Sequence, residues 1–363
     1  MFHLKVLQAE FGDCLLLEFG APVKPAYVLI DGGPPGTYDG HLRAELLKLA
    51  RRDLALVVLS HVDNDHIVGL LDMTSELKNQ RANHQEETVT VRQLWHNSFA
   101  TTIGHGNNTE ARLRTMMKTA AATMVQSGVT VLGIGEGDML RRDALLLGIP
   151  LNHDFQDGLI CVDNTPSPVM IDNLTLQVVG PTQANLEELQ SEWEAWLDKH
   201  EGAGSDPLLA ANADRSVPNL SSIMLLAKAD SKTVLLTGDG RSDHLLAGLK
   251  MAGLLAGDST LKVDVLKLPH HGSDRNMTRK FFRTVVADTY VASANGKDGN
   301  PDLATLIWLV EAAKEQSRRP RIVVTNETPS TQKLLDEYPP AEYGYELQFL
   351  AKGDHCVTLE LST

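Results

Sequence analysis

The sequence predicts an α/β protein in which two β-rich layers, each covered by helices, meet face to face. Apolar runs of strand length alternate with stretches of helical spacing along the chain. Residues 54–60 form a continuous apolar run, which is typical of a strand covered on both faces. The second half repeats this order without a sharp sequence repeat. We expect a single domain over 1–363, with an N-terminal half of about 1–183, a C-terminal half of about 218–363, and a polar, mobile segment at 201–217.

The first half begins with paired strands around a Gly12-Asp13 turn and continues through a Pro-containing loop. A helix is predicted over 41–52, where Leu42, Leu46, Leu47 and Ala50 share one face. An Ala/Met-rich helix is predicted over 108–126, with Asn107, Asn108 or Thr109 as its cap. The strands expected in this half are 4–7, 14–19, 26–33, 54–60 and 89–95.

The first half ends in a β-rich stretch at 150–183, whose best strand is 174–179. Residues 184–199 have helical spacing and carry Trp193 and Trp196. Two strand–helix units then complete the chain. The other elements expected before them are strands at 222–227, 232–237 and 263–268 and a helix at 241–253.

The composition is that of an acidic globular protein. Apolar residues make up 42% of the 363 residues and charged residues 22%, which excludes wholesale disorder. Lys and Arg total 33 against 47 Asp and Glu, for a net charge of −14. This balance argues against an extended nucleic-acid-binding surface. The composition points to no particular protein partner.

The chain carries no signal for export or for a membrane. Its three cysteines, Cys14, Cys161 and Cys356, lie far apart with no CxxC pair, as expected of buried thiols in a reducing compartment. The N-terminus runs directly into a strand-like segment, and no apolar run approaches the roughly 20 residues of a membrane helix. We therefore expect a cytoplasmic protein without a membrane partner.

A cluster of metal-ligand types follows the apolar run 54–60. It comprises His61, Asp63, Asp65 and His66, four ligands within six residues. Imidazole and carboxylate together suit Zn²⁺, Mn²⁺ or Fe²⁺, and the carboxylates favour the harder metals. The alternative is a polar turn whose aspartates bond backbone N–H groups. Four such residues at the exit of one buried strand favour the metal site.

This cluster resembles the His-x-His-x-Asp-His motif of the metallo-β-lactamase superfamily, with Asp63 in place of the second histidine. The His-x-Asp-x-Asp-His form is similar to that of ComEC-type DNA-uptake proteins and of the phosphorylcholine esterases of cell walls. The resemblance spans nearly the whole chain and implies an αββα four-layer sandwich with two mixed β-sheets flanked by helices. The further segments that match in the family's order are 29–33, 219–222, 235–239 and 266–273.

The resemblance also implies a centre with two divalent metal ions, Zn²⁺ or Mn²⁺. His61 and Asp63 would hold one ion, Asp65 and His66 the other, and Asp239 would bridge them. One or both of His270 and His271 would complete the coordination, and the other would orient substrate or donate a proton. Adjacent residues of a strand point to opposite faces, although Gly272 can relax that rule. The alternatives are a Gly-Asp-Gly hairpin turn at 238–240 and ordinary core or surface histidines.

The sequence departs from the family at the third motif, where many zinc members carry a histidine. His96 is the candidate substitute, and a histidine hydrogen-bonded in a loop is the alternative. Asp13 and Asp31 are expected to support metal-bound histidines or to form turns. Ser273 and Asn219 are candidates to touch substrate or to cap a helix or loop. Lys297, in a Gly/Asn-rich loop, is a candidate phosphate contact, although Asn300 stands where the family often has a histidine.

The resemblance implies hydrolysis by a metal-bound hydroxide, with Asp65, His270 and His271 as the catalytic side chains. A phosphodiesterase or nuclease is the favoured reading. The alternatives are hydrolysis of another ester, amide or thioester, and a non-catalytic partner or sensor that retains the fold. A basic run at Arg275, Arg279, Lys280 and Arg283 would suit a phosphodiester substrate, but its spacing is also that of a solvated helix face.

Overall fold

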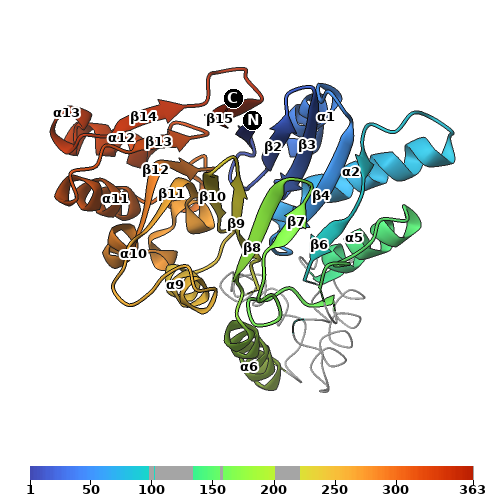
Figure 1. The fold of residues 1–363 in the computed structure, drawn as a ribbon, viewed down its shortest axis with the longest axis horizontal. Helices are drawn as coiled ribbons and strands as arrows, with labels where there is room; N and C mark the ends of the chain where they lie inside the picture. The colour runs from blue at the N-terminus through green and yellow to red at the C-terminus, as the bar shows by residue number, and fades with distance from the viewer. Residues whose placement is uncertain (98–101, 103–133, 156–157, 201–220, 363) are drawn as a thin grey trace.

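The computed structural model describes residues 1–97, 102, 134–155, 158–200 and 221–362. Two β-sheets lie face to face, and helices cover the outer face of each (Figure 1). The helix predicted at 108–126 and the segment 201–217 lie outside the described residues. Both sheets mix parallel and antiparallel pairs, as the sequence predicted.

The first sheet is antiparallel at one side and parallel at the other. Its strands β15, β1, β2 and β3 pair antiparallel, and β4 pairs parallel with β3, β5 and β6. The polypeptide thus brings its last strand back beside its first, so that the two termini lie close together (Figure 1). The strands are β1 Phe2–Leu7, β2 Leu15–Ala21, β3 Lys24–Ile30, β4 Asp53–Leu59, β5 Thr90–Val91, β6 Leu94–His96 and β15 Cys356–Ser362.

The second sheet contains β7 to β14 in sequence order. Strands β7 to β10 pair antiparallel, whereas β10 to β14 pair parallel, each through a helix-containing crossover or loop. This sheet begins at β7, before residue 183. The strands are β7 Val169–Ile171, β8 Leu174–Gly180, β9 Met224–Ala229, β10 Lys232–Leu236, β11 Leu261–Lys267, β12 Val285–Ala292, β13 Arg321–Val324 and β14 Glu346–Phe349.

Among the described residues, three large core clusters follow from strand alternation. Inward-facing residues of both sheets, such as Leu17, Val58 and Val265, form one cluster between the sheets. Their alternate neighbours pack against helices on the outer faces. The helices over the first sheet are α1 Arg43–Leu47, α2 Asn64–Ala82 and α5 Ile134–Leu146. The helices of the second half are α6 Gln183–His200, α9 Ser242–Met251, α10 Arg279–Thr284, α11 Leu303–Glu315, α12 Pro329–Glu337 and α13 Pro340–Tyr343.

Several sequence predictions need correction. The helix expected over 41–52 is shorter: a π-helical turn, Tyr38–Leu42, precedes α1. Leu47 is exposed and Leu49 is buried instead, because the chain leaves the helix at Lys48. The single strand expected at 89–95 is two short strands, β5 and β6. Helix α2 begins within the metal-ligand cluster, at Asn64, although no helix was predicted there.

The candidate metal centre

The first ligand cluster sits where β4 ends and α2 begins. His61 follows the strand, Asp63 is the N-cap residue of α2, and Asp65 and His66 lie in its first turn. The Asp63 side chain makes no capping hydrogen bond, and its Oδ2 atom lies 3.6 Å from Nε2 of His61. Asp63 therefore does not serve the capping role that the polar-turn alternative assigns to it.

Asp239 and the His270-His271 pair come from neighbouring strands of the second sheet. Asp239 follows β10, and the histidines follow β11, which pairs parallel with β10. The carboxyl ends of parallel strands meet at one edge of a sheet, which is the usual place for a site in an α/β fold. The Ile223 amide donates a hydrogen bond to the Ser60 carbonyl (2.9 Å), which joins this edge to the end of β4 in the first sheet.

Both histidines of the pair face the same carboxylate. Nε2 of His270 and Nε2 of His271 lie 3.7 and 3.4 Å from the oxygens of Asp239. This is unlike a strand, because His270 and His271 both adopt left-handed backbone angles, with φ of 47° and 54°. Such angles are strained in residues other than glycine and are found where a site requires them. The local backbone thus turns two adjacent imidazoles toward one point.

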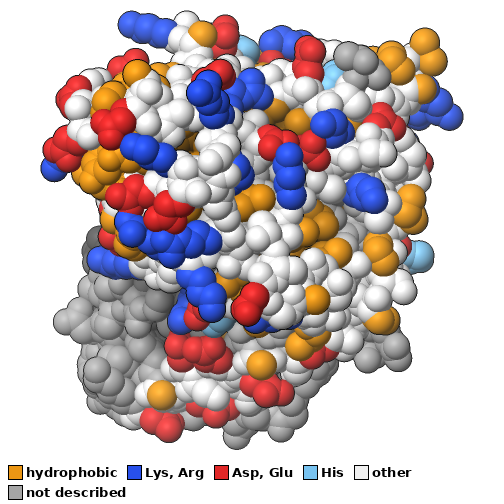
Figure 2. Space-filling model, turned by 60° about the vertical axis from the view of Figure 1, so that its left-hand side comes forward, with side chains coloured by type: hydrophobic (Ala, Val, Ile, Leu, Met, Phe, Trp, Pro, Cys, Tyr) orange, Lys and Arg blue, Asp and Glu red, His pale blue; other side chains and the backbone are white. Residues whose placement is uncertain are grey.

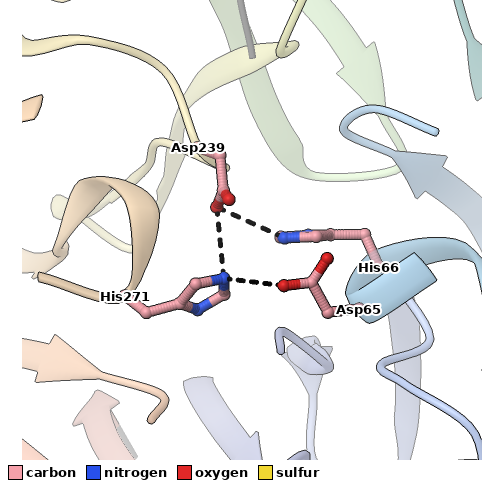
Figure 3. A group of neighbouring side chains, drawn as sticks. All are labelled: Asp65, His66, Asp239 and His271. Atoms are coloured by element: carbon pink, nitrogen blue, oxygen red, sulfur yellow. Dashed lines mark ion pairs between the residues drawn. The ribbon is translucent and has the colours of Figure 1, made fainter. Parts of the chain in front are cut away.

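The two carboxylate oxygens of Asp239 face two different sets of ligands. Oδ1 lies 3.2 Å from Nε2 of His66 and 3.4 Å from Nε2 of His271, and the latter atom is also 3.5 Å from Oδ2 of Asp65. Figure 3 shows these four side chains converging from both halves of the fold. Oδ2 lies 3.8 Å from Nε2 of His61 and 3.7 Å from Nε2 of His270. The geometry is that of two adjacent ligand sets sharing one carboxylate.

Outer contacts fix the histidine rings so that Nε2 points inward. Nδ1 of His66 donates to Oδ2 of Asp31 at 2.8 Å, and Nδ1 of His271 donates to the carbonyl of Ser293 at 2.9 Å. Ser60 lies 3.0 Å from Nδ1 of His61, and both its amide and its hydroxyl donate to Asp31. A partner on Nδ1 leaves the lone pair of a neutral imidazole on Nε2, as a metal ligand requires.

The inner atoms of this cluster suit a divalent cation. Nε2 of His61, His66 and His271 and Oδ1 of Asp239 are buried and have no hydrogen-bond partner among the described residues. Buried polar atoms are otherwise almost always paired. A lone pair directed at a carboxylate oxygen is repulsive unless a positive charge lies between them. The residues therefore fit the pair of metal ions that the fold family implies.

The electrostatics of the cluster point the same way. Burial lowers the pKa of His66, but the carboxylates of Asp239 and Asp31 outweigh it and place that pKa well above its ordinary value. Burial also lowers the pKa of His271, but the carboxylates of Asp239 and Asp13 outweigh it and raise that pKa well above the usual range. Both shifts mean that the site stabilises positive charge, whether as a proton or as a metal ion.

The opening of the centre is on the side of Asp63, Asp65 and His270. Their side chains are about a quarter exposed, at 24%, 25% and 23%, whereas those of His61, His66 and Asp239 are buried. Burial lowers the pKa of His270, although the charge of Asp239 acts to raise it. The net lowering of the pKa keeps the His270 imidazole neutral. Asp65 is held ionised: burial raises its pKa, but His271 and His66 outweigh that and keep it well below its usual range.

Three residues that support the centre were not singled out from the sequence. Ser60 and Ser293 are small polar residues at strand ends, with no distinguishing pattern. Lys267 is fully buried at the end of β11, where it forms an ion pair with Asp13. A single charged residue between Leu266 and Leu268 in an apolar strand was an available signal, because a buried lysine needs a partner. Asp31 accepts from Nδ1 of His66, and Oδ1 of Asp13 lies 3.4 Å from Nδ1 of His271; their support of metal-bound histidines stays a prediction.

The remaining predicted site residues lie away from the buried ligand atoms of the cluster or outside the described residues. His96, at the end of β6, is buried with both ring nitrogens unpaired among the described residues, and burial lowers its pKa to about 4. It makes no ion pair with the described cluster. Ser273 is buried and its side chain caps no helix. Lys297 lies over the Phe11 ring, 3.2 Å from its centroid. Asn219 lies outside the described residues.

The basic run after the His pair is a solvated helix face. Arg279 pairs with Glu311, and Arg283 pairs with Glu315 at 2.7 Å, both across to α11. Figure 2 shows basic and acidic side chains interspersed over the face that it presents. Arg279 and Arg283 are therefore engaged in surface ion pairs with α11.

Comparison with known proteins agrees with this architecture. Residues 10–166 match the metallo-beta-lactamase superfamily model, which establishes the metallo-β-lactamase fold predicted from the sequence. No curated protein matches the chain. Of the described residues, none forms a helix long and apolar enough to cross a membrane.

Solved structures give weaker similarities. A provisionally named metal-dependent hydrolase from Parabacteroides distasonis aligns at 12% identity and a TM-score of 0.36, over 88% of this chain and 93% of that one. A diphosphatase of the PhnP family aligns at 12% identity and a TM-score of 0.38, over 100% of this chain and 98% of that one. A protein of unknown function from Enterococcus faecalis aligns at 10% identity and a TM-score of 0.32, over 98% and 78%.

Proposed function

We propose that this protein, which carries a metallo-β-lactamase superfamily domain over residues 10–166, is a two-metal hydrolase of small phosphodiesters. The observation that carries the proposal is the division of ligands between the two oxygens of Asp239. His61 and His270 face one oxygen, and His66 and His271 face the other. A bridging carboxylate of this kind is typical of two-metal sites in phosphatases and nucleases.

Each ion would have a set of ligands from both halves of the fold. His61, Asp63 and His270 would hold one ion together with Oδ2 of Asp239. Asp65, His66 and His271 would hold the other together with Oδ1 of Asp239. The pair supplies an acidified water as nucleophile and a positive charge for the group under attack. His270 thereby takes the place of the missing third-motif histidine, and His96 is not needed.

The side chains of the open face would handle substrate and protons. Asp65 is ionised and partly exposed, so it can accept a hydrogen bond from the attacking water and orient it. The neutral imidazole of His270 borders the same opening. Asn300 donates to the His270 carbonyl at 3.4 Å and steadies that strained residue. Lys297, exposed on Phe11, would contact a substrate phosphate from the rim.

The donor set and the surface together favour a small phosphodiester as substrate. Three carboxylates in the set suit Mn²⁺ as well as Zn²⁺, and hard metals suit phosphate oxygens. The net charge of −14 and the paired arginines of α10 disfavour a long nucleic acid. A relationship to the ComEC-type branch remains part of this proposal and rests on Asp63.

An activity panel tests the proposal against its alternatives. Protein loaded with Mn²⁺ or Zn²⁺ is assayed with bis(p-nitrophenyl) phosphate, p-nitrophenyl phosphate, single- and double-stranded DNA, a chromogenic lactam and a thioester. We expect the diester to be cleaved fastest and duplex DNA to be cleaved poorly. Turnover of only the lactam or the thioester would refute the phosphodiesterase. Bound metal without any turnover would favour a non-catalytic sensor.

A further inference from the structure

Lys267 places a positive charge inside the ligand cluster. Its side chain is fully buried, and Nζ pairs with Asp13 and donates to the carbonyl of Gly238 at 3.1 Å. Nζ also lies 3.9 Å from Oδ1 of Asp239, the oxygen that faces His66 and His271. An ammonium is an unexpected neighbour for a cation site, because it repels the ion that the site is to bind.

The charges of the centre show what this ammonium offsets. The described ion pairs of the cluster involve five carboxylates, Asp13, Asp31, Asp63, Asp65 and Asp239, and the single ammonium of Lys267. With neutral imidazoles the cluster carries four negative charges, which two divalent ions balance. Without any ion, the buried carboxylates Asp13, Asp31 and Asp239 depend on the remaining cations for the compensation that a low-dielectric interior demands. Lys267 then remains the fixed cation that holds Asp13 and faces Asp239.

We propose that Lys267 is a built-in counter-cation that stabilises the metal-free centre and weakens binding of the ion held at Asp65, His66 and His271. This inference rests on the proposed metal site. The ammonium and that ion both face Oδ1 of Asp239, so each reduces the other's interaction with that carboxylate. By linkage, the stability that Lys267 gives to the metal-free protein beyond what it gives to the metal-bound protein equals the binding free energy that it withholds from the ion.

A purely supporting role for Lys267 predicts the opposite sign. Oδ1 of Asp13 lies 3.4 Å from Nδ1 of His271, and Lys267 holds the other oxygen of that carboxylate. If Lys267 served only to position Asp13 behind His271, its removal would loosen a ligand and weaken ion binding. The direction of the change in affinity therefore separates charge compensation from ligand positioning.

The experiment compares Lys267→Met with wild type by calorimetric titration of Mn²⁺ and Zn²⁺ and by melting in EDTA and in excess ion. Methionine keeps the length and the packing but removes the charge. We expect the ion held at Asp65, His66 and His271 to bind at least about tenfold more tightly to Lys267→Met than to wild type. We also expect the melting temperature to fall more in EDTA than in excess ion. Lys232→Met, which removes an exposed ammonium paired with Asp264, is the control and should leave both readouts unchanged.

A Lys267→Met variant that binds the ion as wild type does, or more weakly, would overturn the proposal. If Lys267→Met does not fold even with metal, the double variant Lys267→Met/Asp13→Asn decides. It removes one positive and one negative charge, so the charge account expects it to fold and to bind both ions with near wild-type affinity. Failure of the double variant to bind ions contradicts that account. Wild-type protein that binds no ion refutes the metal centre itself, which is a separate result.

Discussion

Nε2 of His66 lies 3.2 Å from Oδ1 of Asp239, and this approach joins the two halves of the fold. His66 belongs to α2, which follows a strand of the first sheet, and Asp239 follows β10 of the second. Neither half holds the complete ligand set. The packing of the two sheets therefore assembles the site, and changes at their junction are expected to alter metal binding.

Asp239→Asn tests the shared carboxylate. The amide keeps the shape but offers one neutral oxygen, so it cannot serve two cations. We expect one ion to be lost and the rate of hydrolysis to fall by at least about a hundredfold. Changes to residues that only support a ligand already cost up to about a hundredfold, so a change to the shared ligand should cost at least as much. Asp243→Asn, on an exposed residue paired with Arg241, is the nearby control. Wild-type turnover in Asp239→Asn would rule out the bridging role.

Asp31→Asn tests the support behind His66. Asp31 accepts from Nδ1 of His66 and from both donors of Ser60. An amide weakens this hold on the ring, so metal affinity should fall about ten- to a hundredfold. Asp172 also has a positive φ, of 51° against 59° for Asp31, but lies in an exposed turn. Asp172→Asn is thus a matched control, and equal effects of the two changes would contradict the assignment.

Metal binding should release protons. Asp239 and other carboxylates raise the pKa of His66 and of His271 well above the usual range despite burial, so both rings are protonated at neutral pH without metal. Ligation requires neutral Nε2 atoms, and affinity therefore rises as the pH rises toward those pKa values. Calorimetry in buffers of different ionisation enthalpy measures the release. Uptake of protons, or affinity that falls with rising pH, would show the sign to be wrong.

Gly12→Ala should disturb the centre through its backbone. A Cβ at Gly12 would lie 1.9 Å from the carbonyl oxygen of Asp65, which cannot move without moving the ligand. Overpacking of this kind costs about 1–3 kcal/mol, and we expect a lower melting temperature together with weaker metal binding. Gly40→Ala meets no atom within 4 Å and is the control. A Gly12→Ala protein with unchanged stability and affinity would contradict this packing.

The sequence was sufficient for the strands and for the order of the ligand motifs. The apolar run ending at Leu59 and the cluster from His61 to His66 are local patterns that need no knowledge of the rest of the chain. Two β-rich layers covered by helices followed from the alternation of strands and helices, the αββα sandwich followed from the family resemblance, and the structure confirms this architecture. The ligand roles of the cluster stay predictions until metal binding is measured.

Features that depend on distant contacts or unusual backbone angles could not be predicted. Strand alternation places His270 and His271 on opposite faces, and only their left-handed angles bring both to Asp239. Lys267 is paired with Asp13, which comes from the other sheet and from the far end of the sequence. The return of β15 beside β1 is likewise a long-range pairing with no local pattern.

The metal content of the purified protein tests the central claim most directly. The wild-type chain is stripped with chelator, reconstituted with Mn²⁺ or Zn²⁺, desalted and subjected to elemental analysis beside Asp239→Asn. We expect two ions per chain for wild type and no more than one for Asp239→Asn. Wild-type protein that retains no stoichiometric metal after reconstitution would contradict it.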